Sequence, residues 1–339
     1  MIVTAQQLVE KPCTLRPHVV LVGAGASRAA FPNGDATGQH IPVMDDLVDI
    51  IDLQSLIEGA GIDTEGERNF EAIYGELVSE PRHARTVEEI EGRIDGYFSG
   101  LSLPDRATLY DLLLISLRPT DAVITFNWDP FLFDAYQRNR DAVPLPGIFF
   151  LHGNVRIGAC LEHDRWGARN GRCPDCRQHL TDVPLLYPIR QKNYSADPYI
   201  RRNWEAAKTL FMEAFTITIF GYGAPDSDTD AVELLRRAWF TRSTRTFEHI
   251  EIIDIAPQTQ LHDRWSPFTP TAHYQVEAAF EQCRIARWPR RTCESLFYPM
   301  TQGKPCEDFP LPSTGSIAEL QARAADIARH EEGLRIHAL

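Results

Sequence analysis

Residues 18–27 read HVVLVGAGAS, an apolar run that ends in a glycine turn before a helical pattern. Strands covered by helices on both faces are almost wholly apolar, and residues 18–23 fit that description. Gly23 and Gly25 let the backbone approach a phosphate, and the start of a following helix supplies N–H donors. Arg28 stands where the usual dinucleotide fingerprint has its third glycine, so the strict pattern is not met. The stretch predicts a strand, turn and helix that either bind a nucleotide or form only a tight turn.

Four further apolar runs predict strands at residues 122–126, 148–153, 216–221 and 250–255. Helical patterns lie between most of these runs, which favours an α/β fold with a Rossmann-like doubly wound parallel sheet. The helix expected after the fourth strand has aspartates suited to its N-terminus. Its apolar face is predicted to consist of Ala231, Leu234, Leu235, Ala238 and Trp239.

At 339 residues the chain is longer than one core usually grows, so we expect a sheet domain that carries insertions. The Rossmann-like domain is predicted to combine residues 1–44, 119–152 and 182–300. A helical insertion is expected at 45–118, a zinc-binding insertion at 153–181, and a linker with an amphipathic helix at 301–339. Capping boxes predict two helix starts, one at Thr86 with Glu89 and one at Ser316 with Glu319.

The chain is acidic, with 34 Lys and Arg against 47 Asp and Glu and a net charge of −13. Such a surface repels nucleic acid and anionic membranes, so direct nucleic-acid binding is not expected. The basic stretch RIARWPRR, residues 284–291, is either a solvated surface segment or a local binding patch. No run of about 18 apolar residues is present, and we expect a cytoplasmic protein with no membrane partner.

Polar side chains follow two of the predicted strands. VITFNWDPF, residues 123–131, places Asn127 and Asp129 at a strand end, and FFLHGN sends His152 out of the next strand. Carboxyl ends of parallel strands build the sites of open α/β sheets, so we expect these side chains to lie beside the glycine turn. A lone histidine at a strand end is more often a packing or capping residue than a catalytic one. Two strand ends that both carry polar side chains together favour a functional site. Trp128 is expected to point the other way and to pack.

The segment CLEHDRWGARNGRCPDC, residues 160–176, has metal-ligand spacing. Cys160 and His163 are separated by two residues, as are Cys173 and Cys176, and short knuckles of this kind hold tetrahedral Zn²⁺. Four protein ligands leave no position for water, so the zinc is predicted to be structural. His179 is an alternative ligand, and four reduced, unliganded side chains are the alternative interpretation.

The ordered motifs GAGAS, TFNWD, LHG, the cysteine pairs, FGYGAPDSD and IEIIDIAP resemble the sirtuin (silent information regulator) family from about Val19 to Ile255. The resemblance implies that the sheet domain binds NAD and that the two insertions are a helical and a zinc module. It implies that the pyrophosphate is lined by Gly23, Ala24, Gly25 and Ser27, and the adenosine side by Gly221, Gly223 and Asp254. It further implies that Asn127 lies near the ribose and the reacting water, Asp129 near the carboxamide, and that His152 is catalytic.

Positions at which this sequence departs from the sirtuin pattern distinguish between the branches of that family. Phe126 stands where protein deacylases carry Gln, and residues 184–194, PLLYPIRQKNY, lack their Phe-Gly-Glu stretch. TFNWDPFLFDAY, NFEAIYGELV and FGYGAPDSDTD are similar to bacterial sirtuin-like NAD hydrolases, many of which act in defence against phage. The resemblance therefore implies an NAD glycohydrolase that forms nicotinamide and ADP-ribose. An NAD-dependent protein deacylase and a non-catalytic NAD or ADP-ribose sensor are the alternatives.

A free NAD hydrolase would be toxic to its own cell. We therefore expect its activity to be gated by a homo-oligomer or a regulatory protein partner. This expectation is physiological and does not come from particular residues.

Overall fold

The structure is a computed structural model that describes residues 2–13, 16–63, 69–189, 193–241, 249–266, 268, 274–312 and 315–332. Parts of four predicted segments lie outside these residues: 1 and 14–15 in the segment 1–44, 64–68 in the helical insertion, and 190–192, 242–248, 267 and 269–273 in the segment 182–300. In the C-terminal segment they are 313–314 and 333–339. Within the described part of the chain, no helix combines the length and apolar character needed to cross a membrane.

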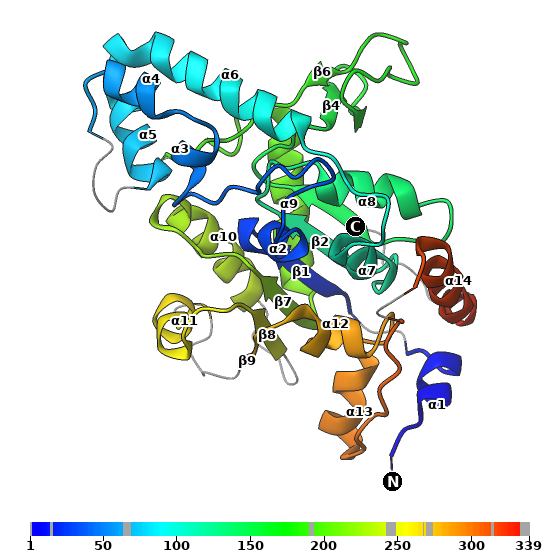
Figure 1. Cartoon of the computed structure of the whole chain (residues 1–339). Coiled ribbons are helices and arrows are strands. Elements are labelled where there is room, and N and C mark those ends of the chain that lie inside the picture. The colour runs from blue at the N-terminus through cyan, green and yellow to red at the C-terminus, as the bar shows by residue number, and fades with distance from the viewer. Residues whose placement is uncertain are drawn as a thin grey trace.

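Six parallel strands form the central sheet in the order β3-β2-β1-β7-β8-β9 (Figure 1). They are β1 (His18–Val22), β2 (Ala122–Thr125), β3 (Gly147–Phe150), β7 (Thr216–Phe220), β8 (His249–Ile253) and β9 (Tyr274–Glu277). This is the doubly wound order, whose direction of winding reverses between β1 and β7. The register aligns Val22 with Thr125 and Phe220, so three strands end at one level. The predicted fold class is confirmed.

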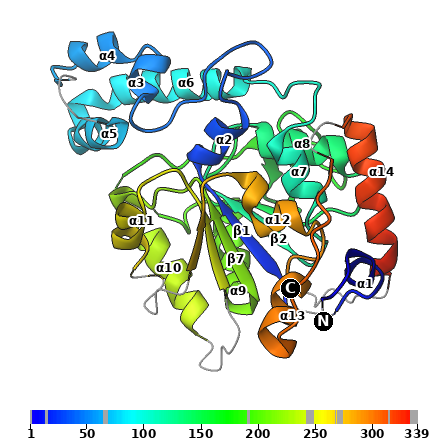
Figure 2. The same cartoon turned by 60° about the horizontal axis from the view of Figure 1, so that its bottom comes forward.

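Helices cover both faces of this sheet, as a parallel sheet requires. On one side α7 (Leu109–Ile115) packs on α8 (Phe131–Asn139), and on the other α9 (Pro198–Glu213) packs on α10 (Thr229–Phe240). Right-handed crossovers place these pairs on opposite faces, because the chain winds in opposite directions from β1 and from β7. Figure 2 shows the strands between these groups. The predicted face of α10 is confirmed, with Ala231, Leu235 and Trp239 buried.

Four helices beyond the carboxyl ends of the strands form what we call the helical module: α3 (Leu47–Ile50), α4 (Gln54–Gly59), α5 (Phe70–Ser79) and α6 (Ala84–Gly100). The capping box predicted at Thr86 and Glu89 is wrong, since α6 begins at Ala84 without a side-chain cap. A 3-10 turn, Pro81–His83, leads directly into α6, so the chain is already helical before Thr86. Helix α7 lies apart from this module, against α8 and α14 (Ile317–Ala328).

The cysteine-bearing insertion forms a small antiparallel sheet in the order β5-β4-β6. Its strands are β4 (Ile157–Cys160), β5 (Arg165–Ala168) and β6 (Thr181–Asp182). The apolar-run criterion missed these short strands and also β9, because β5, β6 and β9 are largely exposed or half-buried and carry no continuous apolar stretch.

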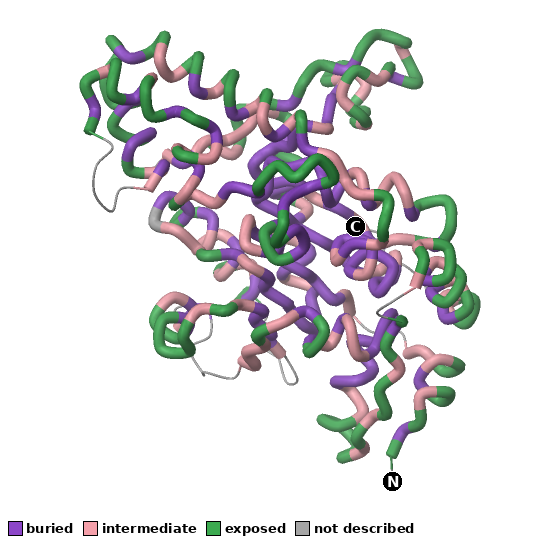
Figure 3. The backbone as a smooth tube through the Cα atoms, in the orientation of Figure 1, coloured by how far each residue is buried: buried purple, intermediate pink, exposed green. Residues whose placement is uncertain are grey.

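The capping box at Ser316 is confirmed: its hydroxyl accepts from the Glu319 N–H, and Glu319 accepts from the Ser316 N–H. Helix α14 buries Leu320, Ala324 and Ile327 against the sheet domain. Figure 3 shows that burial is concentrated along the central strands and the helices that cover them.

The basic stretch 284–291 is neither a solvated segment nor an open binding patch. Arg290 and Arg291 are both 0% exposed. Arg290 donates to the carbonyl groups of Leu117 at 2.8 Å and Pro144 at 3.1 Å. Both guanidinium groups also bind Glu331 at 2.6 Å. A buried charge is tolerated only when it is paired and hydrogen-bonded, and here the pairing ties the turn that follows α14, Arg329–Glu331, to the core.

Candidate active site

A cavity of about 760 Å³ lies at the carboxyl ends of the central strands. The strand ends contribute Phe126, His152 and Gly221, and the helical module and the segment leading into it contribute Met44 and Glu71. Ligand sites of doubly wound sheets lie in the crevice where the strand order reverses, and this cavity occupies that crevice. Its volume falls in the range of pockets that enclose a small ligand or cofactor.

Two turns pack backbone against backbone at the reversal point. The Gly23 N–H donates to the Phe220 carbonyl at 3.0 Å, and the Gly25 N–H donates to the Gly221 carbonyl at 2.9 Å. A Cβ atom on Gly25 would lie 2.8 Å from the Gly221 oxygen, and one on Gly23 would lie 2.5 Å from the Tyr222 Cα. These glycines therefore permit the close packing of the two turns that form the floor of the cavity.

Nearly all of the predicted pocket residues line this cavity. They are Gly23, Ala24, Gly25, Asn127, Asp129, His152, Gly221, Gly223 and Asp254. Ser27 does not line it and is fully buried beneath. Asp254 closes a local turn, since its Oδ1 accepts from the Ala256 N–H at 2.8 Å. The sheet thus gathers strand ends from five separate parts of the sequence around one space.

Asn127 is fixed through its amide nitrogen. Nδ2 donates to the Gly23 carbonyl and to Ser27 Oγ, each at 3.0 Å. A carbonyl oxygen only accepts, so the Gly23 contact sets the orientation of the Asn127 amide. The acceptor Oδ1 is the end of this amide that is left for a ligand hydroxyl or a water molecule. The residue is 8% exposed, at the cavity wall.

Asp129 supports Asn127 through Ser27. Ser27 Oγ donates to Asp129 Oδ2 at 2.6 Å, and the Phe131 N–H donates to Asp129 Oδ1 at 3.2 Å. Burial raises the pKa of Asp129 to about 6, although these two hydrogen bonds act in the opposite direction. Both carboxylate oxygens are engaged inside the protein, which makes orientation of Ser27 and Asn127 the role that this geometry favours.

Tyr110 belongs to the same network and was not foreseen from the sequence. Its hydroxyl lies 2.6 Å from Ser27 Oγ and 3.3 Å from Asn127 Nδ2. Burial holds the pKa of Tyr110 well above its usual range, so the phenol keeps its proton. The signal that could have found it is the Thr108 capping box, which starts α7 and fixes the direction of Tyr110 two residues later.

His152 leaves β3 into an aromatic setting. The Phe126 ring meets its imidazole edge-on at 4.7 Å, and the Tyr194 ring lies parallel to it at 6.3 Å. Its Nε2 is 3.8 Å from Oδ1 of Asp228, a residue that was expected only to favour a helix N-terminus. The imidazole is 5% exposed and lines the cavity, as general acid–base catalysis would require.

Trp128 packs as predicted, although its position also borders the cavity. It is 5% exposed and lies against Phe98 at 5.8 Å and Tyr187 at 5.1 Å between ring centroids. The indole therefore joins the strand end to the helical module and to the segment after β6.

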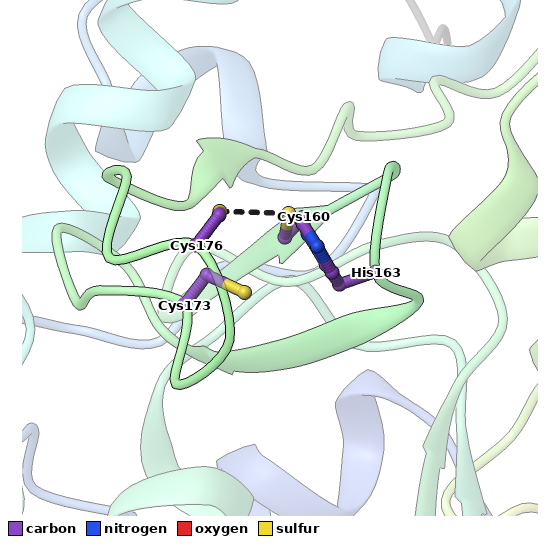
Figure 4. A group of neighbouring side chains, drawn as sticks. All are labelled: Cys160, His163, Cys173 and Cys176. Carbon is purple, nitrogen blue, oxygen red and sulfur yellow. Dashed lines mark hydrogen bonds between the residues drawn. The ribbon is translucent and has the colours of Figure 1, made fainter.

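The predicted metal ligands come together outside the cavity, in the small sheet (Figure 4). Ligand atoms of Cys160, His163, Cys173 and Cys176 all lie within 4.8 Å of one another. Cys160 Sγ is 3.8 Å from Cys176 Sγ and 3.6 Å from His163 Nδ1. Ligand separations of about 3.5–3.8 Å are those of a tetrahedral site with Zn–S bonds near 2.3 Å. The four residues fit a structural Zn²⁺, and His179 is not part of the group.

Replacing Cys173 with serine is expected to remove the metal and loosen the small sheet. Wild-type protein should contain about one zinc ion per chain and the variant almost none, by elemental analysis. The unfolding midpoint should fall by roughly 5 °C or more, since loss of a structural metal weakens folding by several kcal/mol. Cys306→Ser is the matched control, because Cys306 lies outside the group. Equal zinc content in both variants would contradict the assignment.

The chain matches no protein-family model and no curated protein sequence. Among solved structures it is similar to a Sir2 homologue in complex with NAD, at 14% identity, covering 98% of this chain and 94% of that chain, with a TM-score of 0.41. A Sir2 homologue mutant in complex with ADP-ribose gives 14% identity, 98% and 97% coverage and a TM-score of 0.39. A third similar structure is Sir2 bound to an inhibitor, 2′-O-acetyl-ADP-ribose and a deacetylated p53 peptide. It is 17% identical, the match covers 85% of this chain and 94% of that chain, and the TM-score is 0.35. Values of this size assign neither an activity nor a ligand to this chain.

Proposed function

We propose that this chain is a sirtuin-like NAD hydrolase that cleaves the nicotinamide–ribose bond and transfers ADP-ribose to water. The observation that carries the proposal is the shared cavity. Asn127 and His152 line it together with the glycine turns at the reversal point of a doubly wound sheet. Crevices at that point bind dinucleotides, and the polar pair provides groups for chemistry at the ribose.

The reaction places modest demands on the site. Nicotinamide leaves a pyridinium as a neutral molecule, so its departure needs no general acid. The site must orient the ribose, stabilise positive charge on it and aim a water molecule at the anomeric carbon. Asn127 Oδ1 is suited to hold that water or a ribose hydroxyl, since its Nδ2 is already bound to Gly23 and Ser27. The C–N bond breaks, a C–O bond forms, and His152 accepts the proton that the water releases.

The segment that follows β6 supports water over an acyl-lysine peptide as the acceptor. The Leu186 N–H donates to the His152 carbonyl at 2.9 Å, and a Cβ on Gly153 would lie 2.2 Å from the Pro184 oxygen. This apolar segment therefore lies directly against the end of β3, and its residues Leu186 and Pro188 line the cavity. A deacylase needs room beside the ribose for its peptide.

Phe126 supports the same choice. Its ring stacks on Tyr222 at 4.4 Å and meets His152 edge-on, which gives an apolar wall where deacylases are expected to carry Gln. A phenyl ring makes no hydrogen bond to a ribose hydroxyl, so binding of the ribose must rely on other groups of the cavity.

Product analysis tests the proposal. Purified protein is incubated with NAD, with and without an acetyl-lysine peptide, and the products are separated by chromatography. We expect nicotinamide and ADP-ribose in equal amounts without peptide. Turnover that depends on the peptide would identify a protein deacylase instead. Binding of ADP-ribose without any turnover would identify a sensing module.

Depletion of NAD is the effect through which such an enzyme would act in defence against phage, and the proposal includes that role. Constitutive activity would harm the host, so we also propose gating by a homo-oligomer or a regulatory protein partner. Expression of the chain alone in growing cells tests the gating. Full activity of the isolated monomer in cells that grow normally would contradict it.

A further inference from the structure

Asp228 occupies a helix N-cap without acting as a cap. It precedes α10, and its side chain makes no capping hydrogen bond. An aspartate at this position usually accepts from an N–H of the first turn, a contact worth about 1 kcal/mol. The Asp228 side chain does not make that hydrogen bond and instead lies in the wall of the cavity. Its sequence position alone therefore gives a misleading picture of its role.

Two contacts aim the Asp228 carboxylate at the reaction site. The Tyr222 hydroxyl donates to Oδ2 at 3.0 Å, and Oδ1 lies 3.8 Å from His152 Nε2. The second distance exceeds a direct hydrogen bond, so the imidazole and the carboxylate face one another closely without being bonded through these atoms. Asp228 is 5% exposed, which keeps its charge poorly screened by water. A substrate hydroxyl that reaches His152 would therefore also be within reach of Asp228.

Asp129, another carboxylate that lines the cavity, makes its contacts inside the protein. Its two oxygens accept from Ser27 and from the Phe131 N–H. Asp228 has Oδ1 directed toward His152, and its Oδ2 accepts a hydrogen bond from the Tyr222 hydroxyl. Of these two carboxylates, Asp228 is thus the one that faces the space beside the catalytic histidine.

We propose that Asp228 is a second catalytic carboxylate, which accepts a hydrogen bond from a hydroxyl of the nicotinamide ribose and stabilises the positive charge that develops there. The inference rests on the proposed function, because it requires NAD in the cavity. As the C–N bond breaks, its electron pair leaves with nicotinamide and the ribose becomes cationic. Asp228 forms no covalent bond; water adds to the anomeric carbon, and its proton passes to His152. A fixed negative charge beside a developing cation stabilises the transition state and so accelerates such a step strongly.

The test compares Asp228→Asn with Asp230→Asn, a matched control in the first turn of α10 whose side chain is exposed and outside the cavity lining. For Asp228→Asn we expect kcat for NAD hydrolysis to fall about a hundredfold or more, with a much smaller change in KM. Asp230→Asn should keep the wild-type rate. Tyr222→Phe removes one hydrogen bond but leaves the charge, so we expect a loss of about tenfold or less.

A binding measurement separates failure of this inference from failure of the proposed function. ADP-ribose carries the terminal ribose and ADP does not, so titration calorimetry with both ligands reports on that ribose alone. Asp228→Asn should weaken ADP-ribose binding about fivefold or more and leave ADP binding unchanged. Wild-type hydrolysis of NAD with an equally fast Asp228→Asn variant would overturn the role of Asp228 only. The role of Asp228 would also be overturned if Asp228→Asn weakened ADP-ribose and ADP binding equally, or weakened neither. A wild-type protein that binds neither ligand would overturn both proposals.

Discussion

Asn127→Ala is expected to abolish the proposed NAD hydrolysis, with a loss of about a thousandfold or more in kcat, while the fold should be retained. The side chain is held through Nδ2 by hydrogen bonds to Gly23 and Ser27 and by a longer one to Tyr110, so its acceptor oxygen is presented in one orientation. Preorganised groups of this kind act in the transition state without further reorganisation. Alanine removes the acceptor Oδ1. It also removes the amide that Ser27 and Asp129 hold in place.

Steady-state assays of nicotinamide release measure this effect, and His152→Ala should show a similar loss. Asn127→Asp is the informative companion, because it keeps the size and an acceptor oxygen but offers no donor to the Gly23 carbonyl. If catalysis requires the orientation that the Gly23 contact gives to the amide, Asn127→Asp should also be inactive. Unfolding midpoints and zinc content close to those of the wild type establish that the variants are folded. Wild-type turnover in Asn127→Ala or in His152→Ala would refute the assignment of the site.

Four of the six central strands, β1, β2, β7 and β8, could be predicted because they are buried on both faces and therefore read as apolar runs. Strand β3 lies at an edge and buries only Ile148 and Phe150, but its sequence is still an apolar run. The position of Asn127 and His152 at the cavity could be predicted for a related reason, since the crevice of an open α/β sheet lies where such runs end. Strand β9, at the opposite edge, has no such signal, because Gln275 and Glu277 interrupt it and all four of its residues are only half-buried. A continuous apolar run therefore marks the inner strands dependably, whereas an edge strand can lack it.

Tyr110 and Asp228 show why other residues in and behind the cavity wall could not be predicted. Tyr110 lies in a helix that the sequence places with the helical insertion, and only the packing of α7 on α8 brings its hydroxyl to Ser27. Asp228 has the residue type and position of an ordinary helix cap, and only the structure shows that its side chain points elsewhere. Arg290 and Arg291 have the composition of a surface patch, but their partners are backbone carbonyls and Glu331 from distant segments. Each of these roles depends on contacts between remote parts of the chain.

Gly221→Ala is expected to unfold the crevice at the reversal point. Gly221 has φ +57°, a left-handed conformation that costs an L-residue about 1 kcal/mol. An added Cβ would lie 2.2 Å from the Ala26 backbone nitrogen and 2.5 Å from the Gly25 carbonyl carbon. Neither atom belongs to a flexible side chain, so the two turns must move apart and weaken the Gly25–Gly221 hydrogen bond. We expect a loss of roughly 3 kcal/mol or more in the free energy of unfolding, and loss of ADP-ribose binding.

Gly223→Ala is the matched control for stability, two residues further along the same turn. Its backbone is not left-handed, and the nearest atom to an added Cβ is the end of the Arg264 side chain at 4.0 Å. Thermal unfolding should therefore shift by no more than about 2 °C for Gly223→Ala and by several times that for Gly221→Ala. Equal midpoints would contradict the packing role assigned to Gly221. The pair separates two reasons for a glycine in this turn. At Gly221 the backbone of a neighbouring turn already occupies the position of a side chain. At Gly223 that position is open, and a glycine is needed there only if a ligand approaches.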